Sequence, residues 1–183
     1  LLHTKPANPK WAHKISSFDW PNNKETTSRL ETPNTRWQQP DFVCQLAGSL
    51  YIMKDGSLDR IDPESWQFQT SPTKWNDVKG ICSVKNVRGS GTDRLYVVTA
   101  TGLSEVNPQT WESKQQPGDW SAARLVAATA DRLHILKQGT LHSIDLKTLE
   151  ARQGKQDWSG VSWMCGWGNQ LYLFDGQAHH RVD

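Results

Sequence analysis

The chain has 183 residues, of which 36% are hydrophobic, and its 21 basic and 19 acidic residues give a formal net charge of +2. This length suits one domain, and the balanced charge creates no broad basic field, so nucleic acid is not expected as a partner. No apolar run approaches the length of a membrane span, and no signal-peptide pattern is present. Because the chain begins with Leu1 rather than Met, a secreted or cell-surface location is slightly favoured.

The first 23 residues are polar and rich in Pro and Asn, yet they contain Trp11 and Trp20. A disordered tail rarely carries two tryptophans. We therefore expect this N-terminal arm to pack across the rest of the molecule or onto a partner.

The remainder of the chain repeats a unit of about 37 residues four times. Each unit has a Leu-Tyr or Leu-His pair, and eleven residues after its Leu comes a β-branched residue followed by Asp or Asn. In the first three units a Trp stands thirteen residues after that Asp or Asn. Residues 86–92 lengthen the second unit and are predicted to be a loop insertion. The repeated residues are Leu50, Leu95, Leu133 and Leu171, and Trp37, Trp75, Trp120 and Trp158.

Each unit predicts four short strands separated by turn residues. The strand after each Trp has small or apolar residues on both alternating faces, which is typical of a strand buried on both sides, so it is placed innermost. The fourth strand is the most polar and is expected at the rim. Asp62-Pro63 and Asn107-Pro108 predict turns before it, because Asx side chains bond backbone amides two residues on and proline presets φ. The predicted fourth strands are residues 64–69, 109–114 and 147–152.

The fourth unit ends at Asp183, before its own fourth strand, and residues 26–31 (TTSRLE) align with the fourth strands of the other units. A linear solenoid has no reason to divide a repeat between its two ends, whereas a ring is closed in this way. We therefore predict an all-β fold, a four-bladed β-propeller with four-stranded blades, whose last blade is closed by the N-terminal strand. The predicted parts are an arm outside the ring at 1–23, a closing strand and connection at 24–37, and blades at about 38–70, 75–115, 120–153 and 158–183, the last joined by 24–31.

The repeated cysteines and tryptophans are interpreted as packing residues. Cys44, Cys82 and Cys165 each follow a repeated Trp position by seven residues, and equivalent positions in a ring point toward the next blade, so they do not converge as metal ligands must. A disulfide among them is not expected for the same reason. The tryptophans of the repeat, each able to bury a large apolar area between adjacent blades, are Trp37, Trp75, Trp120 and Trp158.

Other aromatic and histidine side chains leave alternatives open. Trp163 and Trp167 break the symmetry of the innermost strands, so they either fill the core or contact a ligand. His142 and His180 occupy equivalent third-strand positions, and they are either solvated or form a pH-sensitive or metal-binding pair. His134 replaces a repeated Tyr and is expected to be a packing residue.

No catalytic or cofactor-binding pattern is present. The sequence has no nucleophile elbow, metalloprotease helix motif, phosphate loop or dinucleotide fingerprint. We therefore expect no enzymatic activity, no cofactor and no metal.

Each unit combines a leading Trp, a Leu-Tyr strand, a Gly-x-Leu turn and an Ile-Asp pair. Over residues 24–183 this pattern resembles the repeats of tectonin- and tachylectin-type propeller lectins. The Val-Trp-Gly-Val run typical of tectonins is absent. Four blades are also similar to the hemopexin-like fold, whose blade motif and blade helix this sequence lacks. These resemblances imply sugar, glycoconjugate or protein binding.

Two functions of nearly equal weight follow. The first is a non-catalytic module that binds a carbohydrate or glycoconjugate on a propeller face, and the alternative is a protein-interaction scaffold, or a subunit of an assembly, that uses the N-terminal arm. The partner is thus a glycan or a protein, and the sequence leaves the oligomeric state open. The candidate ligand-binding residues come from the second-to-third-strand loops, from the fourth-to-first connections and from the two tryptophans that break the symmetry. They are Lys54, Asp55, Lys137, Gln138, Asp175, Arg36, Lys74, Asp119, Asp157, Trp163 and Trp167.

Overall fold

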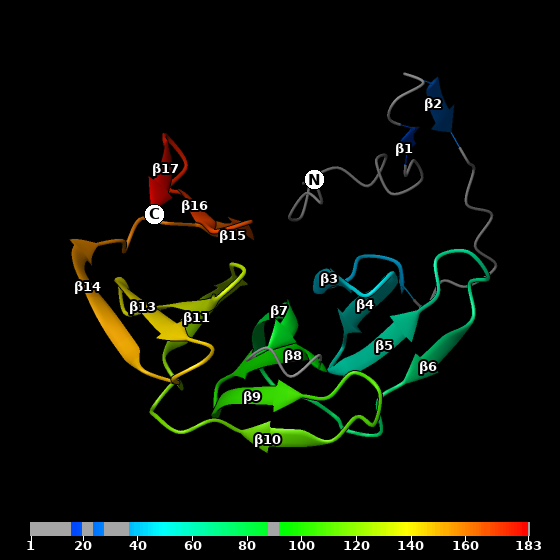
Figure 1. Ribbon diagram of the computed structural model, residues 1–183, viewed down its shortest axis with the longest axis horizontal. Coiled ribbons are helices and arrows are strands. Elements are labelled where there is room, and N and C mark those ends of the chain that lie inside the picture. Colours follow the sequence, from blue (N-terminus) through cyan, green and yellow to red (C-terminus); the bar gives the residue numbers. More distant parts are fainter. Residues whose placement is uncertain (1–15, 20–23, 28–36, 88–91, 183) are drawn as a thin grey trace.

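The computed structural model describes residues 16–19, 24–27, 37–87 and 92–182. In this part of the chain, four antiparallel sheets are arranged as the four blades of a β-propeller (Figure 1). The predicted all-β fold with four blades is therefore confirmed. The sheets of blades 1 to 3 have four strands each, and the sheet of blade 4 has three strands among the described residues.

Each blade is a meander in which consecutive strands pair antiparallel. Blade 1 comprises β3 (Phe42–Leu46), β4 (Ser49–Lys54), β5 (Ser57–Ile61) and β6 (Phe68–Thr70). Blade 2 comprises β7 (Val78–Val87), β8 (Thr92–Thr99), β9 (Gly102–Val106) and β10 (Ser113–Gln115). Blade 3 comprises β11 (Ala123–Ala128), β12 (Arg132–Lys137), β13 (Thr140–Asp145) and β14 (Ala151–Asp157). Blade 4 comprises β15 (Trp163–Trp167), β16 (Gln170–Phe174) and β17 (His179–Val182).

The strand that follows each repeated Trp is innermost, as predicted. Figure 1 shows β3, β7, β11 and β15 toward the middle of the ring and β6, β10 and β14 on its outside. β3 packs beside β7, β7 beside β11, and β11 beside β15. Among the described strands, β15 and β3 share no comparable contact. Blades 1 and 4 therefore do not pack on each other as neighbouring blades do.

The loop insertion in the second unit lengthens one hairpin. β7 extends to Val87, which pairs with Thr92 at the start of β8, while residues 88–91 lie outside the described part. The described residues of β7 and β8 thus continue the hairpin on both sides of the insertion.

The turns between third and fourth strands use the predicted side-chain chemistry. Oδ1 of Asp62 accepts a hydrogen bond from the Glu64 amide at 2.8 Å, and Oδ1 of Asn107 accepts one from the Gln109 amide at 2.9 Å. These turns take up residues that were assigned to the fourth strands. The fourth strands consequently begin later than predicted, at Phe68, Ser113 and Ala151.

The N-terminal strand differs from the prediction. β1 (Ser16–Asp19) and β2 (Lys24–Thr27) pair with each other in a separate two-stranded sheet. β2 holds the first part of the predicted closing segment, so the predicted pairing of this segment with β17 is wrong for residues 24–27, and residues 28–31 lie outside the described part. A hairpin between neighbouring segments closes a short loop, whereas pairing the two ends of the chain closes a loop of the whole ring at a greater entropic cost.

Each blade has two faces that follow from the alternation of side chains along its strands. The forward face packs on the next blade, and the backward face packs on the previous one. In blade 2, for example, Tyr96 and Val98 belong to a buried cluster with blade 3, whereas Leu95 and Val97 belong to a cluster with blade 1. The buried backward-face residues of blades 2 to 4 are Ile81, Leu95 and Val97, then Val126, Leu133 and Ile135, then Met164, Leu171 and Leu173.

The repeated tryptophans lie at the junctions between blades. Trp75, Trp120 and Trp158 are buried, one in each of the three clusters that join neighbouring blades. The backbone amide of Trp75 donates to the carbonyl of Gly56 at 2.9 Å. The amide of Trp158 bonds the carbonyl of Gly139 in the same way, so Trp75 and Trp158 are each tied to the second-to-third-strand turn of the blade that precedes them in the chain.

Candidate functional site

The forward face of blade 4 has no following blade to cover it in the described structure. β15 and β16 alternate along their length, so that Met164, Leu171 and Leu173 point to blade 3 and are buried. The side chains of opposite parity form the forward face. Its residues are Trp163, Cys165, Trp167, Tyr172 and Phe174.

Trp167 shows most clearly that this face is uncovered. Its repeat equivalents in blades 1 to 3 are Leu46, Val84 and Thr129, which are 4%, 2% and 6% exposed. Trp167 itself is 78% exposed. The same position of the repeat is thus buried wherever another blade follows and open where none does.

The rest of the forward face is aromatic and half-buried. The Phe174 ring stacks on His179 with ring centroids 4.8 Å apart, and the Tyr172 hydroxyl donates to Oε1 of Gln170 at 2.7 Å. Burial raises the pKa of the Cys165 thiol, so this thiol remains protonated and behaves as an apolar group at neutral pH. The face can make apolar and stacking contacts, with a few polar groups at its edges.

The backward face of blade 1 is the counterpart of this surface at the other end of the described blades. Val43, Leu50 and Ile52 are half-buried, while the residues at the same positions in blades 2 to 4 are buried. Their place in the repeat predicts that such residues belong to the core. They are less buried because no blade of the described part of the chain packs on this face, and no local pattern reveals that.

The predicted polar ligand residues lie on one rim of the propeller, where the second-to-third-strand turns meet the connections between blades. Nζ of Lys137 lies 3.0 Å from Oδ2 of Asp119. Hydrogen bonds from Ser121 and then from Lys137 lower the pKa of Asp119 to about 2. Lys137 and Asp119 therefore already bond to each other within the rim.

The other acidic residues of this polar rim also stabilise turns. Oδ1 of Asp157 accepts from the Ser159 amide at 2.9 Å. Asp175 accepts from Nε2 of His180 at 2.9 Å, and this bond, followed by two backbone amides, lowers the pKa of Asp175 well below its usual value. The hydrogen bonds fix the orientation of both carboxylates, and each of them keeps further acceptor capacity.

The remaining predicted residues divide between the rim and other places. Lys74 and Gln138 are exposed, Lys54 is half-buried, and the amide of Asp55 donates to Oδ2 of Asp41 at 2.9 Å. Arg36 lies outside the described residues. Trp163 and Trp167 lie on the forward face of blade 4, and Trp167 stands at the opposite end of β15 from the polar rim. The predicted set therefore does not form one site.

The two equivalent histidines do not come together. His142 packs edge-on against Trp120, with centroids 5.5 Å apart, and His180 packs against Trp158 at 5.3 Å. Each histidine thus lies beside a different junction between blades. Within the described residues, no three His, Cys, Asp or Glu side chains come close enough to hold a metal ion.

His134 is buried, as its place in the repeat predicts. Its Nδ1 lies 2.9 Å from Oγ of Ser143, and its Nε2 lies 3.2 Å from Oγ1 of Thr129. Burial, followed by the charge of Arg132, lowers the pKa of His134 to about 4. The neutral imidazole is therefore a bonded part of the core at neutral pH.

The cysteines are free thiols on forward faces. Cys82 is buried in the cluster between blades 2 and 3, and Cys44 packs against the cluster between blades 1 and 2. Burial raises the pKa of the Cys44 thiol to about 12. These thiols are protonated and serve as small apolar side chains.

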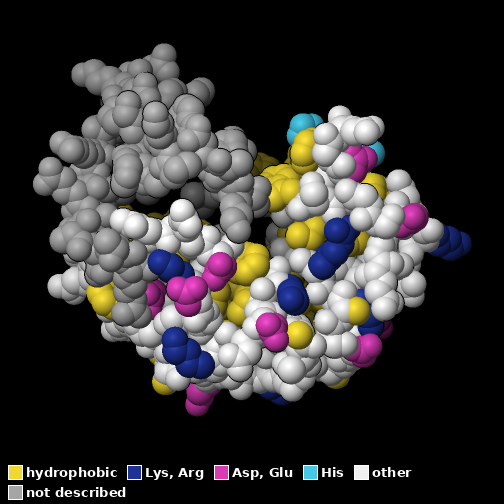
Figure 2. Space-filling view, turned by 180° about the vertical axis from the view of Figure 1, so that it is seen from behind, with side chains coloured by type: hydrophobic (Ala, Val, Ile, Leu, Met, Phe, Trp, Pro, Cys, Tyr) yellow, Lys and Arg dark blue, Asp and Glu magenta, His cyan; other side chains and the backbone are white. Residues whose placement is uncertain are grey.

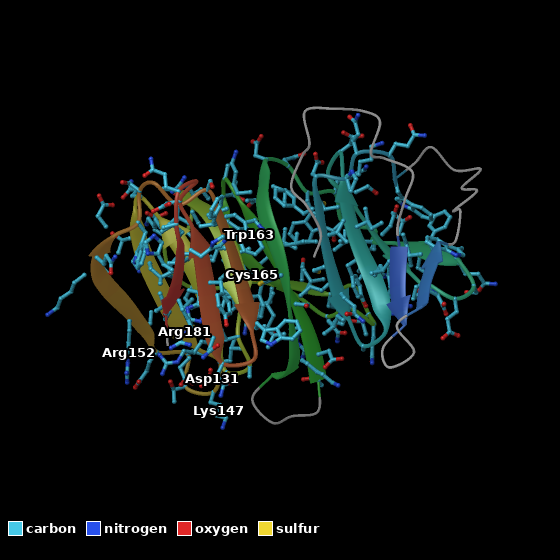
Figure 3. The ribbon with its side chains drawn as sticks, turned by 90° about the horizontal axis from the view of Figure 1, so that it is seen from above. Asp131, Lys147, Arg152, Trp163, Cys165 and Arg181 are labelled. Atoms are coloured by element: carbon cyan, nitrogen blue, oxygen red, sulfur yellow. The ribbon has the colours of Figure 1, made fainter. Side chains whose placement is uncertain are left out.

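Sequence analysis did not single out a group of charged side chains at the edge opposite the polar rim. Figure 3 shows Asp131, Lys147, Arg152 and Arg181 toward this edge of blades 3 and 4, and all four are exposed. Figure 2 shows basic and acidic side chains interspersed over one face, with hydrophobic side chains gathered near its centre. None of these four residues recurs in every unit, so the repeat gives no signal for the group.

Comparisons with known proteins relate the chain to propellers by fold. No protein-family model and no curated protein matches the sequence. No helix in the described residues has the length and apolar character needed to cross a membrane.

Solved structures do match. The chain is similar to PorZ, a bacterial surface component of the type-IX secretion system of Porphyromonas gingivalis, with a TM-score of 0.54, 11% identity, and coverage of 92% of this chain and 24% of that one. It is similar to the extracellular domain of a hybrid two-component system of B. thetaiotaomicron, with a TM-score of 0.56, 16% identity, and coverage of 79% and 20%. A third match, in an S. cerevisiae complex of Dbp5, Nup159 and Gle1, has a TM-score of 0.51, 12% identity, and coverage of 76% and 42%.

These matches establish the fold alone. The chain spans less than half the length of each of these chains.

Proposed function

We propose that the chain is a non-catalytic module that binds protein through the forward face of blade 4. The observation that carries this proposal is the 78% exposure of Trp167, at a repeat position that is buried in the other three blades. Aromatic side chains at the centre of an apolar surface supply most of the binding energy in many protein interfaces. Trp163, Tyr172 and Phe174 surround the same surface with further aromatic area.

The non-catalytic part of the proposal is supported by the state of the nucleophilic side chains. Burial raises the pKa of all three cysteine thiols, and a protonated thiol is a poor nucleophile. The buried imidazole of His134 is engaged by Thr129 and Ser143. Neither group is placed to start a reaction on a bound molecule.

A displayed library of random peptides, panned against the chain immobilised at low density, tests the protein-binding function. We expect enrichment of peptides rich in aromatic and apolar residues, with binding lost in Trp167→Asp. Leu149→Asp is the matched control, because Leu149 is another exposed apolar residue, 42% exposed, on the outer turn of blade 3. Peptides that bind both variants equally, or no enrichment at all, would overturn the proposal.

Carbohydrate binding on the polar rim is the second candidate, and it is supported by the fixed carboxylates of Asp119, Asp157 and Asp175. Carboxylates held by backbone amides can accept hydrogen bonds from sugar hydroxyls without reorganising. The resemblance of the repeat to lectin propellers supports the same candidate. It ranks second because Lys137 and Asp119 already pair with each other.

A glycan array tests this second candidate. Binding to a defined glycan should be lost when Lys137 and Asp119 are both replaced by Ala, and it should be kept in Lys114→Ala, which removes an exposed lysine from β10. An array without binding, or binding that survives the double substitution, would remove carbohydrate as a ligand of this rim.

A further inference from the structure

We propose that the polar rim binds an acidic oligosaccharide at two neighbouring junctions, the one between blades 2 and 3 and the one between blades 3 and 4. At each junction a cation of the innermost strand, Lys79 or Arg124, binds a sugar carboxylate. An aspartate at the start of the next blade, Asp119 or Asp157, accepts a hydrogen bond from a sugar hydroxyl. This inference goes beyond the protein-binding function. It gives the carbohydrate candidate a ligand class and rests on that candidate.

The two cations stand at one repeat position of neighbouring innermost strands. Lys79 in β7 and Arg124 in β11 each follow a repeated Trp by four residues, and both are exposed. The pairing of each strand with the second strand of its blade shifts register at this residue, so each cation is the extra residue of a β-bulge. A bulge redirects a side chain and is over-represented beside functional sites.

The two cations also lie at the same end of strands that are in contact. β7 and β11 pack side by side, and a Cβ added to Gly80 would lie 3.6 Å from the backbone nitrogen of Val126. Lys79 comes one residue before this contact, and Arg124 comes two residues before it. Figure 2 views the polar rim, where Lys and Arg side chains lie among Asp and Glu side chains around a hydrophobic centre.

The sequence Asp-Trp-Ser precedes the innermost strand of blade 3 and again that of blade 4, and it forms the same turn twice. Oδ1 of Asp119 accepts from the amide of Ser121 at 3.2 Å, and Oδ1 of Asp157 accepts from the amide of Ser159 at 2.9 Å. The residue at this position before blade 2 is Lys74. A cation followed by a fixed aspartate is therefore a feature of two junctions and not of the repeat as a whole.

The junction of blades 3 and 4 shows how the cation and the turn meet. Nη2 of Arg124 donates to the carbonyl of Ser159 at 2.7 Å, and the amide of the same serine bonds Asp157. The guanidinium and the carboxylate thus lie on two sides of one residue. The repeat places Lys79 in the same relation to Ser121. In the described part of the chain, neither cation has a carboxylate within 4.0 Å, and Lys79 forms no hydrogen bond.

A ligand that combines an anion with a neighbouring hydroxyl fits this arrangement. A carboxylate makes charge-assisted hydrogen bonds to Lys79 or Arg124, and a hydroxyl donates to a free lone pair of the aspartate. A phosphate dianion would be repelled by Asp119 and Asp157. Because the arrangement recurs at consecutive junctions, a chain of acidic sugars can occupy both at once and gain affinity from the linkage. These features favour an acidic oligosaccharide over a simple anion.

Calorimetric titration of the 183-residue chain with an oligomer of galacturonic acid tests the proposal. The fully methyl-esterified oligomer is the matched ligand without charge, and it should bind about tenfold more weakly. Lys79→Gln and Arg124→Gln should each weaken binding of the acid by about tenfold. The control variants Lys114→Gln and Arg152→Gln remove an exposed cation from β10 and from β14, and they should change the affinity less than about twofold.

A second measurement guards against loss of fold. Arg124→Gln removes the bond to Ser159, so thermal unfolding is compared with that of the unaltered chain. Lys79→Gln removes no hydrogen bond within the described residues, and it tests the site even if Arg124→Gln unfolds. Binding of the acid that survives Lys79→Gln unchanged would overturn the proposed site.

The remaining outcomes separate this inference from the candidate function on which it rests. Equal binding of the acid and its ester would overturn the acidic ligand class and leave carbohydrate binding intact. Equal binding of oligoglutamate, which has carboxylates and no hydroxyls, would overturn the sugar as ligand. No binding of the acid would overturn the inference. If the glycan array then showed a neutral ligand that depends on Lys137 and Asp119, the carbohydrate candidate would stand; an empty array would remove both.

Discussion

The middle blades and the end blades of this protein are built from the same repeat and are buried differently. In β8 residues 95–99 are all buried, and in β12 residues 133–136 are, because a blade packs on each side. In β4 and β16, buried and half-buried residues alternate, because only one side is covered. The comparison teaches that a repeat position determines which way a side chain points, while the neighbouring blade determines whether it is buried.

The largest expected effect is on the free energy of unfolding, when the residue at one repeat position is replaced by Ala in a middle blade and in an end blade. Ile135→Ala in blade 3 should lower the free energy of unfolding by about 4 kcal/mol, because the residue is fully buried and a cavity remains. Ile52→Ala at the equivalent position of blade 1 should cost about 1 kcal/mol, because this side chain is only half-buried. Urea unfolding of both variants measures the difference. Equal losses would mean that blade 1 is covered as fully as blade 3.

The second effect is a pH dependence that belongs to the middle of the propeller. The pKa of His134 is about 4 in the folded chain and about 6.5 when unfolded. Below pH 6.5 the unfolded chain binds a proton that the folded chain does not bind, so stability falls as the pH drops. The loss between pH 7 and pH 4 is about 3 kcal/mol from this residue.

The repeat itself supplies the control for that pH dependence. Blades 1, 2 and 4 have Tyr51, Tyr96 and Tyr172 at the position of His134. The variant His134→Tyr should remove most of the loss between pH 7 and pH 4, measured by urea unfolding at both pH values. An unchanged loss in the variant would assign the acid sensitivity to carboxylates instead.

The smallest effect concerns the outer turns, where Leu149 of blade 3 is exposed and Trp111 of blade 2 packs on blade 1. Leu149 has φ of 63°, a left-handed conformation that is unfavourable for leucine and tolerated by asparagine. Leu149→Asn should therefore raise the free energy of unfolding by about 0.5 to 1 kcal/mol. The equivalent Trp111→Asn should destabilise, because the Trp111 ring packs edge-on against Tyr51 with centroids 6.3 Å apart. Thermal unfolding of the pair is the measurement, and a lower melting temperature for Leu149→Asn would contradict the strain argument.

Much of the fold could be predicted because its signals are local and recur. Leu50 marks a strand of the unit, Asp62 marks a turn, and Trp75 marks the junction with the next blade. The Asx turn at Asp62 forms as its side-chain chemistry predicts. The fourth strands were placed too early, since the residues after Asp62 complete the turn before β6 begins at Phe68. A run of polar residues at a rim carries no alternation that would mark where a strand starts.

The candidate site could be predicted only in part. Trp163 and Trp167 were singled out because they break the repeat, and they lie on the uncovered face of blade 4. The polar candidates share a rim, but the pairing of Lys137 with Asp119 depends on two segments that approach each other only in the fold. No spacing rule indicates which polar side chains are already bonded to one another.

By itself the sequence determined the number of blades, the order of their strands and the direction in which each side chain points, because these follow from periodicity and turn chemistry within a few residues. Only the tertiary structure decided that β2 pairs with β1, that blades 1 and 4 do not pack on each other, and that Trp167 is exposed. These features depend on which distant surfaces meet, and that is settled by loop entropy and packing between whole sheets.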